Sequence, residues 1–260
     1  MNRQTTSEIL KDSMIDLGRT GVIGRFKPLH NGGAMMLEAI CRQAAHVTIG
    51  IGSSNKYNIR NPFTAAESEE MVRAFLADSY ANYDIIHIPD FAHVEKLQGN
   101  RTIHGEAASR ASKTRAPFQT AALKPQRAHR VLDIAEYKDG KKWKEYVVQA
   151  FGPRDSFVSS NGYVRGLLGD VYQLVAPSAL IPPEHWIELR ATAVRVAIAQ
   201  GDAWKSLVPE KVAEYLETRH LIKRFRDEFG LQTLAALAGD PATIYEHERA
   251  GAEALHAQEI

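Results

Sequence analysis

Short apolar runs alternate with helical patterns in the first third of the chain, and this alternation constrains the fold more than any other feature. The runs at 19–25, 46–51 and 83–89 have the length and composition of buried strands. The segments between them carry apolar residues at helical spacing. Strands that alternate with helices in this way favour a parallel sheet with helices on both faces, so we predict an α/β fold.

Two of these helices have recognisable start signals. Asn31 is the expected cap of the helix after the first strand. Thr64 is the expected cap of the next helix, and Glu67, three residues later, completes a capping-box pattern. A short amphipathic helix is also expected over residues 5–17, ahead of the first strand.

The α/β pattern stops at residues 96–130 and then resumes. This segment has eight basic residues, a single acidic one and little apolar periodicity, which indicates an insertion. Beyond it the pattern predicts helices at 143–150, 161–168, 191–200 and 209–229, and strands at 155–159 and 171–175. We therefore divide the chain into an N-terminal helix (1–18), an α/β domain (19–208, with the insertion 96–130) and a helical C-terminal extension (209–260).

Composition excludes several classes of protein. The 260 residues are 44% hydrophobic and 24% charged with a net charge of +1, so no nucleic-acid or membrane partner is expected. Cys41 is the single cysteine, which excludes a disulfide framework and a cysteine-rich metal site. No apolar run reaches the length of a membrane span, and the first residues lack the apolar core of a signal peptide. We expect a cytoplasmic protein.

The segment Gly24–Gly33 (GRFKPLHNGG) is the strongest candidate for a binding site. It follows the first strand, and parallel sheets bind ligands at the carboxyl ends of their strands. A helix N-terminus offers N–H groups to phosphate, and glycines let a ligand approach the backbone. Arg25, Lys27 and His30 are donors that suit a triphosphate. The alternative for His30 is a role in capping or packing beside the loop.

Several motifs resemble, in order, those of the HxGH nucleotidylyltransferases, and most closely the archaeal-type nicotinamide mononucleotide adenylyltransferases. GRFKPLHNGG is similar to the GRFxPxHxGH loop. The segment NPFTAAE at 61–67 resembles NPFTAGER, and the residues around 160–165 resemble an SNNPLVKRLF region. LRATAVR at 189–195 occupies the place of ISxTxxR. The resemblance covers about residues 19–95 and 140–217.

The resemblance implies a Rossmann-like fold and adenylyl transfer from ATP to nicotinamide mononucleotide, with Mg²⁺ held mainly by the nucleotide and water. The residues it implies for catalysis are His30, Arg25, Lys27 and Arg195. Those implied for ATP binding are Gly24, Phe26, Gly32, Gly33, Thr192 and Ala193. Those implied for the mononucleotide are Ser53, Asn61, Phe63, Trp143, Asn161 and Arg165, and for Trp143 plain core packing is the alternative. No protein side chain is expected to ligate a metal. The resemblance also suggests a homo-oligomer, with a monomer as the alternative.

Three positions depart from the family pattern. The second histidine of HxGH is Gly33, the arginine expected after Glu67 is Ser68, and the serine of ISxTxxR is Arg190. One explanation is that the basic insertion supplies the missing charge; the candidate residues are His104, Arg110, Lys113 and Arg115. A second is a nucleotide-binding or regulatory protein with weakened catalysis, and a third is transfer to a different phosphorylated acceptor. Two further alternatives concern the insertion itself: it is a solvated segment without a role in the site, or it contacts nucleic acid.

Overall fold

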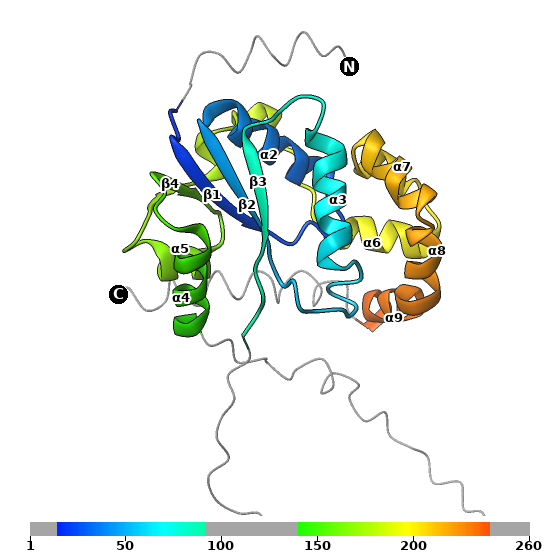
Figure 1. Cartoon of the computed structure of the whole chain (residues 1–260). Coiled ribbons are helices and arrows are strands. Elements are labelled where there is room, and N and C mark those ends of the chain that lie inside the picture. The colour runs from blue at the N-terminus through cyan, green and yellow to red at the C-terminus, as the bar shows by residue number, and fades with distance from the viewer. Residues whose placement is uncertain (1–14, 92–139, 240–260) are drawn as a thin grey trace, which may run out of the picture. The chain divides into compact units, whose positions relative to one another are not determined.

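A five-stranded parallel sheet forms the centre of the protein (Figure 1). The computed structural model describes residues 15–91 and 140–239. The strands are β1 (Arg19–Gly24), β2 (His46–Ile51), β3 (Tyr83–His87), β4 (Ser156–Val158) and β5 (Gln173–Val175). Their order is β3-β2-β1-β4-β5, so the direction of winding reverses between β1 and β4. This confirms the predicted Rossmann-like parallel sheet and places a ligand-binding switch point beside β1.

Helices cover both faces of the sheet. Figure 1 shows α4 and α5 on one side of the strands and α2 and α3 on the other. The helices are α2 (Asn31–Gln43), α3 (Ala65–Leu76), α4 (Gly140–Phe151), α5 (Gly162–Leu168), α6 (Ala191–Gln200), α7 (Glu210–Thr218), α8 (Leu221–Phe225) and α9 (Leu231–Gly239). A π-helical turn, η5 (Arg226–Gly230), joins α8 to α9.

The side chains of strand β4 point into different apolar clusters on the two faces of the sheet. Val158 belongs to a large apolar cluster that also contains residues of α2, α3 and α6. Phe157, its neighbour, points to the opposite face because side chains alternate along a strand. Its ring lies 5.1 Å from that of Phe151 and 5.5 Å from that of Tyr172. The faces therefore have separate cores, one aromatic and one mainly aliphatic.

The predicted capping box is confirmed, whereas the predicted cap of α2 is wrong. The hydroxyl of Thr64 accepts from Glu67 N–H at 3.2 Å, and the Glu67 carboxylate accepts from Thr64 N–H at 2.9 Å. At α2 the cap is His30: its Nδ1 accepts from the N–H of Gly33 at 3.2 Å. Asn31 is the first helical residue, and its amide donates to Ser206 O at 2.9 Å.

The single helix predicted at 209–229 is wrong. It breaks after α7, where His220 adopts a left-handed φ of 54°. The pieces on both sides of the break pack into the same apolar cluster as the sheet, through Leu216 of α7 and Phe225 of α8 among others. The helix predicted at 5–17 does not extend to residues 15–17, which are irregular, and its remainder lies outside the described residues. So do the insertion 96–130 and residues 240–260.

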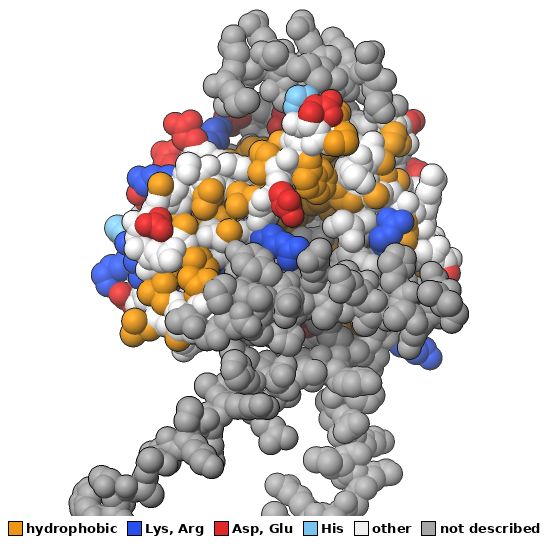
Figure 2. Space-filling view, turned by 180° about the vertical axis from the view of Figure 1, so that it is seen from behind, with side chains coloured by type: hydrophobic (Ala, Val, Ile, Leu, Met, Phe, Trp, Pro, Cys, Tyr) orange, Lys and Arg blue, Asp and Glu red, His pale blue; other side chains and the backbone are white. Residues whose placement is uncertain are grey.

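Charges on the visible surface are dispersed. Figure 2 shows one face, where the coloured basic side chains lie scattered among acidic and hydrophobic ones. This distribution gives that part of the surface no continuous basic track. None of the helices within 15–91 and 140–239 combines the length and the apolar character needed to cross a bilayer.

Candidate functional site

The turn after β1 is built for close packing at the switch point. The carbonyl of Gly24, the last residue of β1, accepts from Gly52 N–H at 2.9 Å, which ties this turn to the one after β2. A Cβ on Gly24 would lie 2.5 Å from the Phe26 ring, so only glycine fits there. Phe26 has a left-handed φ of 49° and is 8% exposed. Its ring therefore packs back on the strand end, and the chain turns sharply toward α2.

His30 lies at the mouth of α2, and one of its ring nitrogens makes a structural bond. Its Nδ1 caps the helix by accepting from Gly33 N–H. Burial, together with the nearby Arg195 charge, lowers the pKa of His30 to about 4. The ring is therefore neutral near pH 7. The capping role and the phosphate-binding role considered from the sequence are compatible, because one nitrogen makes the cap and the other does not.

Lys27 lies elsewhere than the resemblance implies. Instead of lying over the phosphate site, its side chain is only 1% exposed and its Nζ donates to Ser53 O at 2.9 Å. Burial, and then the Arg25 charge, lower the pKa of Lys27 to about 8, against smaller opposing effects of acidic groups. The ammonium thus links the turns after β1 and β2. Arg25 is the exposed cation of this loop.

Thr192 and Arg195 of α6 lie directly against the same loop. Arg195 Nη1 donates to Lys27 O at 3.1 Å, and its Nη2 donates to Thr192 Oγ1 at 3.0 Å. Arg195 is 8% exposed and Thr192 is 9% exposed. The fold therefore brings together residues that are 168 positions apart in the sequence. Ala193, also assigned to ATP, follows in the first turn of α6.

The two glycines after His30 differ in how much space surrounds them. A Cβ on Gly32 would lie 2.8 Å from the carbonyl oxygen of Ile187, so this position requires glycine. A Cβ on Gly33 would meet Leu29 Cδ1 at 3.4 Å and the His30 ring at 3.7 Å, which are ordinary contacts. The backbone therefore has room for a side chain at the position of the missing histidine.

The turn after β2 contains two of the residues assigned to the mononucleotide. Ser53 is 8% exposed with a left-handed φ of 50°. Asn61 is 5% exposed; its Nδ2 donates to Asn58 Oδ1 at 3.1 Å, while its Oδ1 has no hydrogen-bond partner among the described residues. Phe63 is a correction to the expectation. Its side chain is completely buried and stacks on Phe225 with the ring centroids 6.1 Å apart, so it supports the loop and presents no ring to a ligand.

An open hollow of about 330 Å³ lies at the carboxyl ends of β4 and β5. Arg165 and Trp186 line it, together with Ser159 and Ser160. Trp186 is 44% exposed and precedes Ile187, whose carbonyl lies against Gly32, so the hollow adjoins the mouth of α2. An indole face, hydroxyls and a guanidinium suit an aromatic base with its ribose.

Asn161 and Trp143 contribute less to this region. Asn161 is exposed, and its Oδ1 caps α5 by accepting from Val164 N–H at 3.2 Å. Trp143 of α4 is 9% exposed, which favours its packing alternative. Among the predicted site residues, the structure thus brings together the loop from Gly24 to Gly33, Ser53, Thr192 and Arg195. The residues between 104 and 115 that were suggested to replace the charge of the missing histidine lie outside the described residues.

A comparison with protein-family models identifies the family to which this fold and site belong. The model of the cytidylyltransferase-like family matches residues 22–245, which include the second half of β1, strands β2 to β5 and the whole site. The chain belongs to the cytidylyltransferase-like family. The resemblance seen in the motifs is thereby confirmed at the level of the family.

Within the family, the chain is similar to proteins named nicotinamide-nucleotide adenylyltransferase. The chain is 25% identical to a nicotinamide-nucleotide adenylyltransferase of Methanocorpusculum labreanum over 206 residues, 78% of this chain and 93% of the relative. It is 26% identical to an enzyme of the same name from Methanoculleus marisnigri over 213 residues, 81% of this chain and 96% of the relative. A bifunctional NMN adenylyltransferase/ADP ribose pyrophosphatase from Francisella tularensis shares the fold, with a TM-score of 0.53 at 14% identity. That match covers 82% of this chain and 52% of the solved chain.

The donor set of this family member is basic rather than acidic. No three histidine, cysteine, aspartate or glutamate side chains form a metal-binding group within the part of the chain that the structure describes. Arg195 instead places positive charge beside His30, and Arg25 is an exposed cation in the same loop. Since Mg²⁺ prefers oxygen ligands and retains water, an ion here fits as a companion of bound phosphates.

Two residues of this region could not be identified from the sequence. Trp186 lines the hollow. The signal that could have pointed to it is an aromatic residue that follows two prolines a few positions before Thr192. Arg224 of α8 donates to Pro62 O in the turn before α3 and forms an ion pair with Glu67 in the first turn of α3. In the sequence Arg224 is one charge among many on a predicted helix, and nothing in its spacing relates it to Pro62, which lies 162 residues earlier.

Proposed function

We propose that this protein transfers an adenylyl group from ATP to nicotinamide mononucleotide, with Mg²⁺ bound to the nucleotide, and releases pyrophosphate. An oxygen of the mononucleotide phosphate attacks the α-phosphorus of ATP. The bond from that phosphorus to the bridging oxygen breaks, and pyrophosphate leaves with the electron pair. Such a reaction requires mainly position and positive charge from the protein.

The observation that carries the proposal is the contact between the His30 loop and α6. Arg195 is bonded to the carbonyl of Lys27 and lies close enough to His30 to lower its pKa. A guanidinium, a helix N-terminus and a neutral imidazole at one switch point suit a triphosphate. The named adenylyltransferases among the relatives support the reaction, and the hollow beside Trp186 is a suitable location for a base.

A second candidate is a nucleotide-binding protein with weak catalysis. Gly33 favours it, because this position lacks the imidazole of the family loop. Several expectations stay predictions. They are the assignment of individual residues to ATP or to the mononucleotide, the homo-oligomer, the cytoplasmic location and the absence of a nucleic-acid partner.

Pyrophosphate release from ATP, Mg²⁺ and nicotinamide mononucleotide tests the proposal. We expect turnover that depends on both nucleotides and that His30→Ala lowers by about 10²-fold or more, the usual effect of losing one transition-state donor. Lys211→Met, which lies away from the site on α7, serves as the control and should retain turnover. Tight ATP binding without product for nicotinamide mononucleotide and other phosphorylated acceptors would instead support the binding protein.

A further inference from the structure

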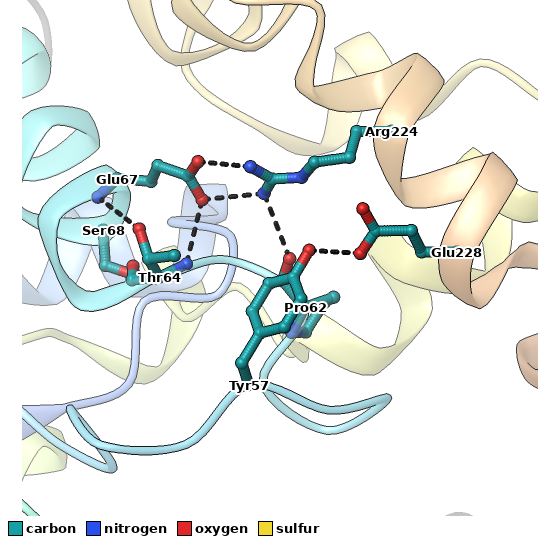
Figure 3. A network of polar contacts seen from close by, with 7 residues as sticks. All are labelled: Tyr57, Pro62, Thr64, Glu67, Ser68, Arg224 and Glu228. Atoms are coloured by element: carbon teal, nitrogen blue, oxygen red, sulfur yellow. Dashed lines mark hydrogen bonds and ion pairs between the residues drawn. The ribbon is translucent and has the colours of Figure 1, made fainter.

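A guanidinium from the C-terminal helices clamps the turn between β2 and α3 (Figure 3). Arg224 of α8 forms a bidentate ion pair with Glu67 of α3: Nη1 lies 2.5 Å from Oε1 and Nη2 lies 2.8 Å from Oε2. The same Nη2 donates to Pro62 O at 3.3 Å. Arg224 therefore holds both the start of α3 and the last part of the turn before it.

A second contact holds the beginning of the same turn. The Arg224 guanidinium lies 5.7 Å from the centroid of the Tyr57 ring, and the Tyr57 hydroxyl donates to the carboxylate of Glu228 in η5. The Tyr57 ring also packs edge-on against Phe229 at 5.3 Å. Residues 57–62 are thus fixed at both ends by one surface, formed by α8 and η5.

The ion pair is favoured over a wide pH range. Burial alone would raise the pKa of Glu67, but hydrogen bonds from Arg224 and the Thr64 N–H, with the Arg224 charge, keep the pKa below its usual value. The side chains of Arg224 and Glu67 are 30% and 17% exposed. Glu67 is therefore ionised at neutral pH and keeps both its capping role and its bond to Arg224.

The clamped turn contains a buried acceptor that has no partner among the described residues. The Oδ1 of Asn61 is shielded from solvent and accepts no hydrogen bond within the described structure, while its Nδ2 is used by Asn58. A buried acceptor left unpaired is costly, so a group in that state suits an N–H donor of a ligand. The amide oxygen can serve that purpose only while the turn keeps its shape.

We propose that Arg224 is a positioning residue for the acceptor mononucleotide: it fixes residues 57–62 and thereby Asn61. The family pattern has an arginine at position 68, where this chain has a buried serine bonded to Thr64 O. The inference rests on the proposed function, because it assigns Asn61 to the acceptor. It adds the C-terminal helices to the determinants of acceptor binding.

Kinetics of Arg224→Met with ATP and nicotinamide mononucleotide test the proposal. We expect the KM for the mononucleotide to rise about tenfold, with kcat and the KM for ATP unchanged within about twofold. Arg224→Lys should recover part of the affinity, since a lysine keeps the charge but not the fork. Equal changes in both KM values, or a change in kcat alone, would overturn the proposal.

Lys211→Met is the matched control. It removes an ion pair to Asp78 that also joins a C-terminal helix to the α3 region but does not touch the turn. It should alter neither KM. If Lys211→Met raises the KM for the mononucleotide as much as Arg224→Met does, general loosening of the C-terminal helices explains the effect and the proposal fails.

Amide hydrogen exchange separates this inference from the proposed function. The N–H groups of Asn58 and Asn61 are bonded across the turn, to Asn61 O at 3.2 Å and Asn58 O at 2.7 Å. In the free protein we expect faster exchange of these amides in Arg224→Met and not in Lys211→Met. Unchanged exchange refutes the clamp whatever the activity. Faster exchange in Arg224→Met, found together with a wild-type protein that lacks turnover, would refute the proposed reaction and leave the clamp established.

Discussion

Replacing Gly33 by histidine should raise the rate of adenylyl transfer, because it restores the imidazole that the family loop has at this position. A Cβ there meets only ordinary contacts, the closest being Leu29 Cδ1 at 3.4 Å. It starts 3.7 Å from Nε2 of His30, so the new ring grows from beside the existing one. The backbone at Gly33 lies in the α2 helix, and no strained φ stands in the way.

The size of the effect follows from what one well-placed donor contributes. Losing such a donor costs about 10²–10³ in kcat, or about 3–4 kcal/mol of transition-state stabilisation. A restored ring without refined surroundings should recover a part of this, and we expect a rise of about tenfold or more. Stability should not suffer, because glycine within a helix is about 0.5–1 kcal/mol less favourable than alanine.

Pyrophosphate release measures the rate, and Gly33→Ala is the matched control. Alanine adds the Cβ without a donor, so it should raise the free energy of unfolding by about 0.4–1 kcal/mol and leave kcat unchanged. Identical kcat values for the histidine and alanine variants, both folded, would refute the reasoning. They would mean that the α-phosphate is not positioned beside Gly33, or that another group already supplies the charge.

Further predictions concern His30 and Lys27. His30→Ala should lower the free energy of unfolding by about 1 kcal/mol through loss of the α2 cap, whereas His30→Asn should keep most of that stability while losing activity, as denaturant titration and turnover can show. Because the pKa of His30 is about 4, kcat/KM should lack an inflection from this residue near pH 6.5; an inflection there that His30→Asn abolishes would contradict the structure. The pKa of Lys27 is about 8 in the folded protein and lies near 10.4 in an unfolded chain, so between these values the unfolded state binds more protons and stability should rise with pH. Denaturant titrations from pH 7.5 to 10 should show that increment in the wild type and not in Lys27→Met, and equal pH profiles would contradict the burial of the ammonium.

The elements of the sheet could be predicted because their signals are local. The alternation of apolar runs and helical patterns indicated the strands, and the Thr64–Glu67 capping box occurs as its four-residue pattern requires. The cap of α2 could not be predicted in the same way. Histidine is an uncommon cap, and its use here depends on a sharp turn at Phe26 that the sequence does not reveal.

Contacts between distant segments account for most of what the sequence could not predict. Lys27 appeared to be a phosphate ligand because of its loop, but its ammonium is directed to the carbonyl of Ser53 in another turn. Phe63 belongs to a motif, yet Phe225 covers its ring. In each case a residue far along the chain decides the role, and local periodicity contains no information about such a partner. Arg195 could be predicted because the family resemblance combines motifs from distant parts of the sequence.

The cap at the mouth of α2 also decides which tautomer His30 adopts. Because Nδ1 accepts the Gly33 N–H, the ring proton must reside on Nε2. Histidines that bind substrates usually have a carboxylate or carbonyl to set this choice, and here a helix backbone does so before any ligand arrives. Nε2 therefore carries the ring proton and acts as a donor for as long as the cap is intact. A substrate that needed an acceptor at that point would have to break the bond that caps α2.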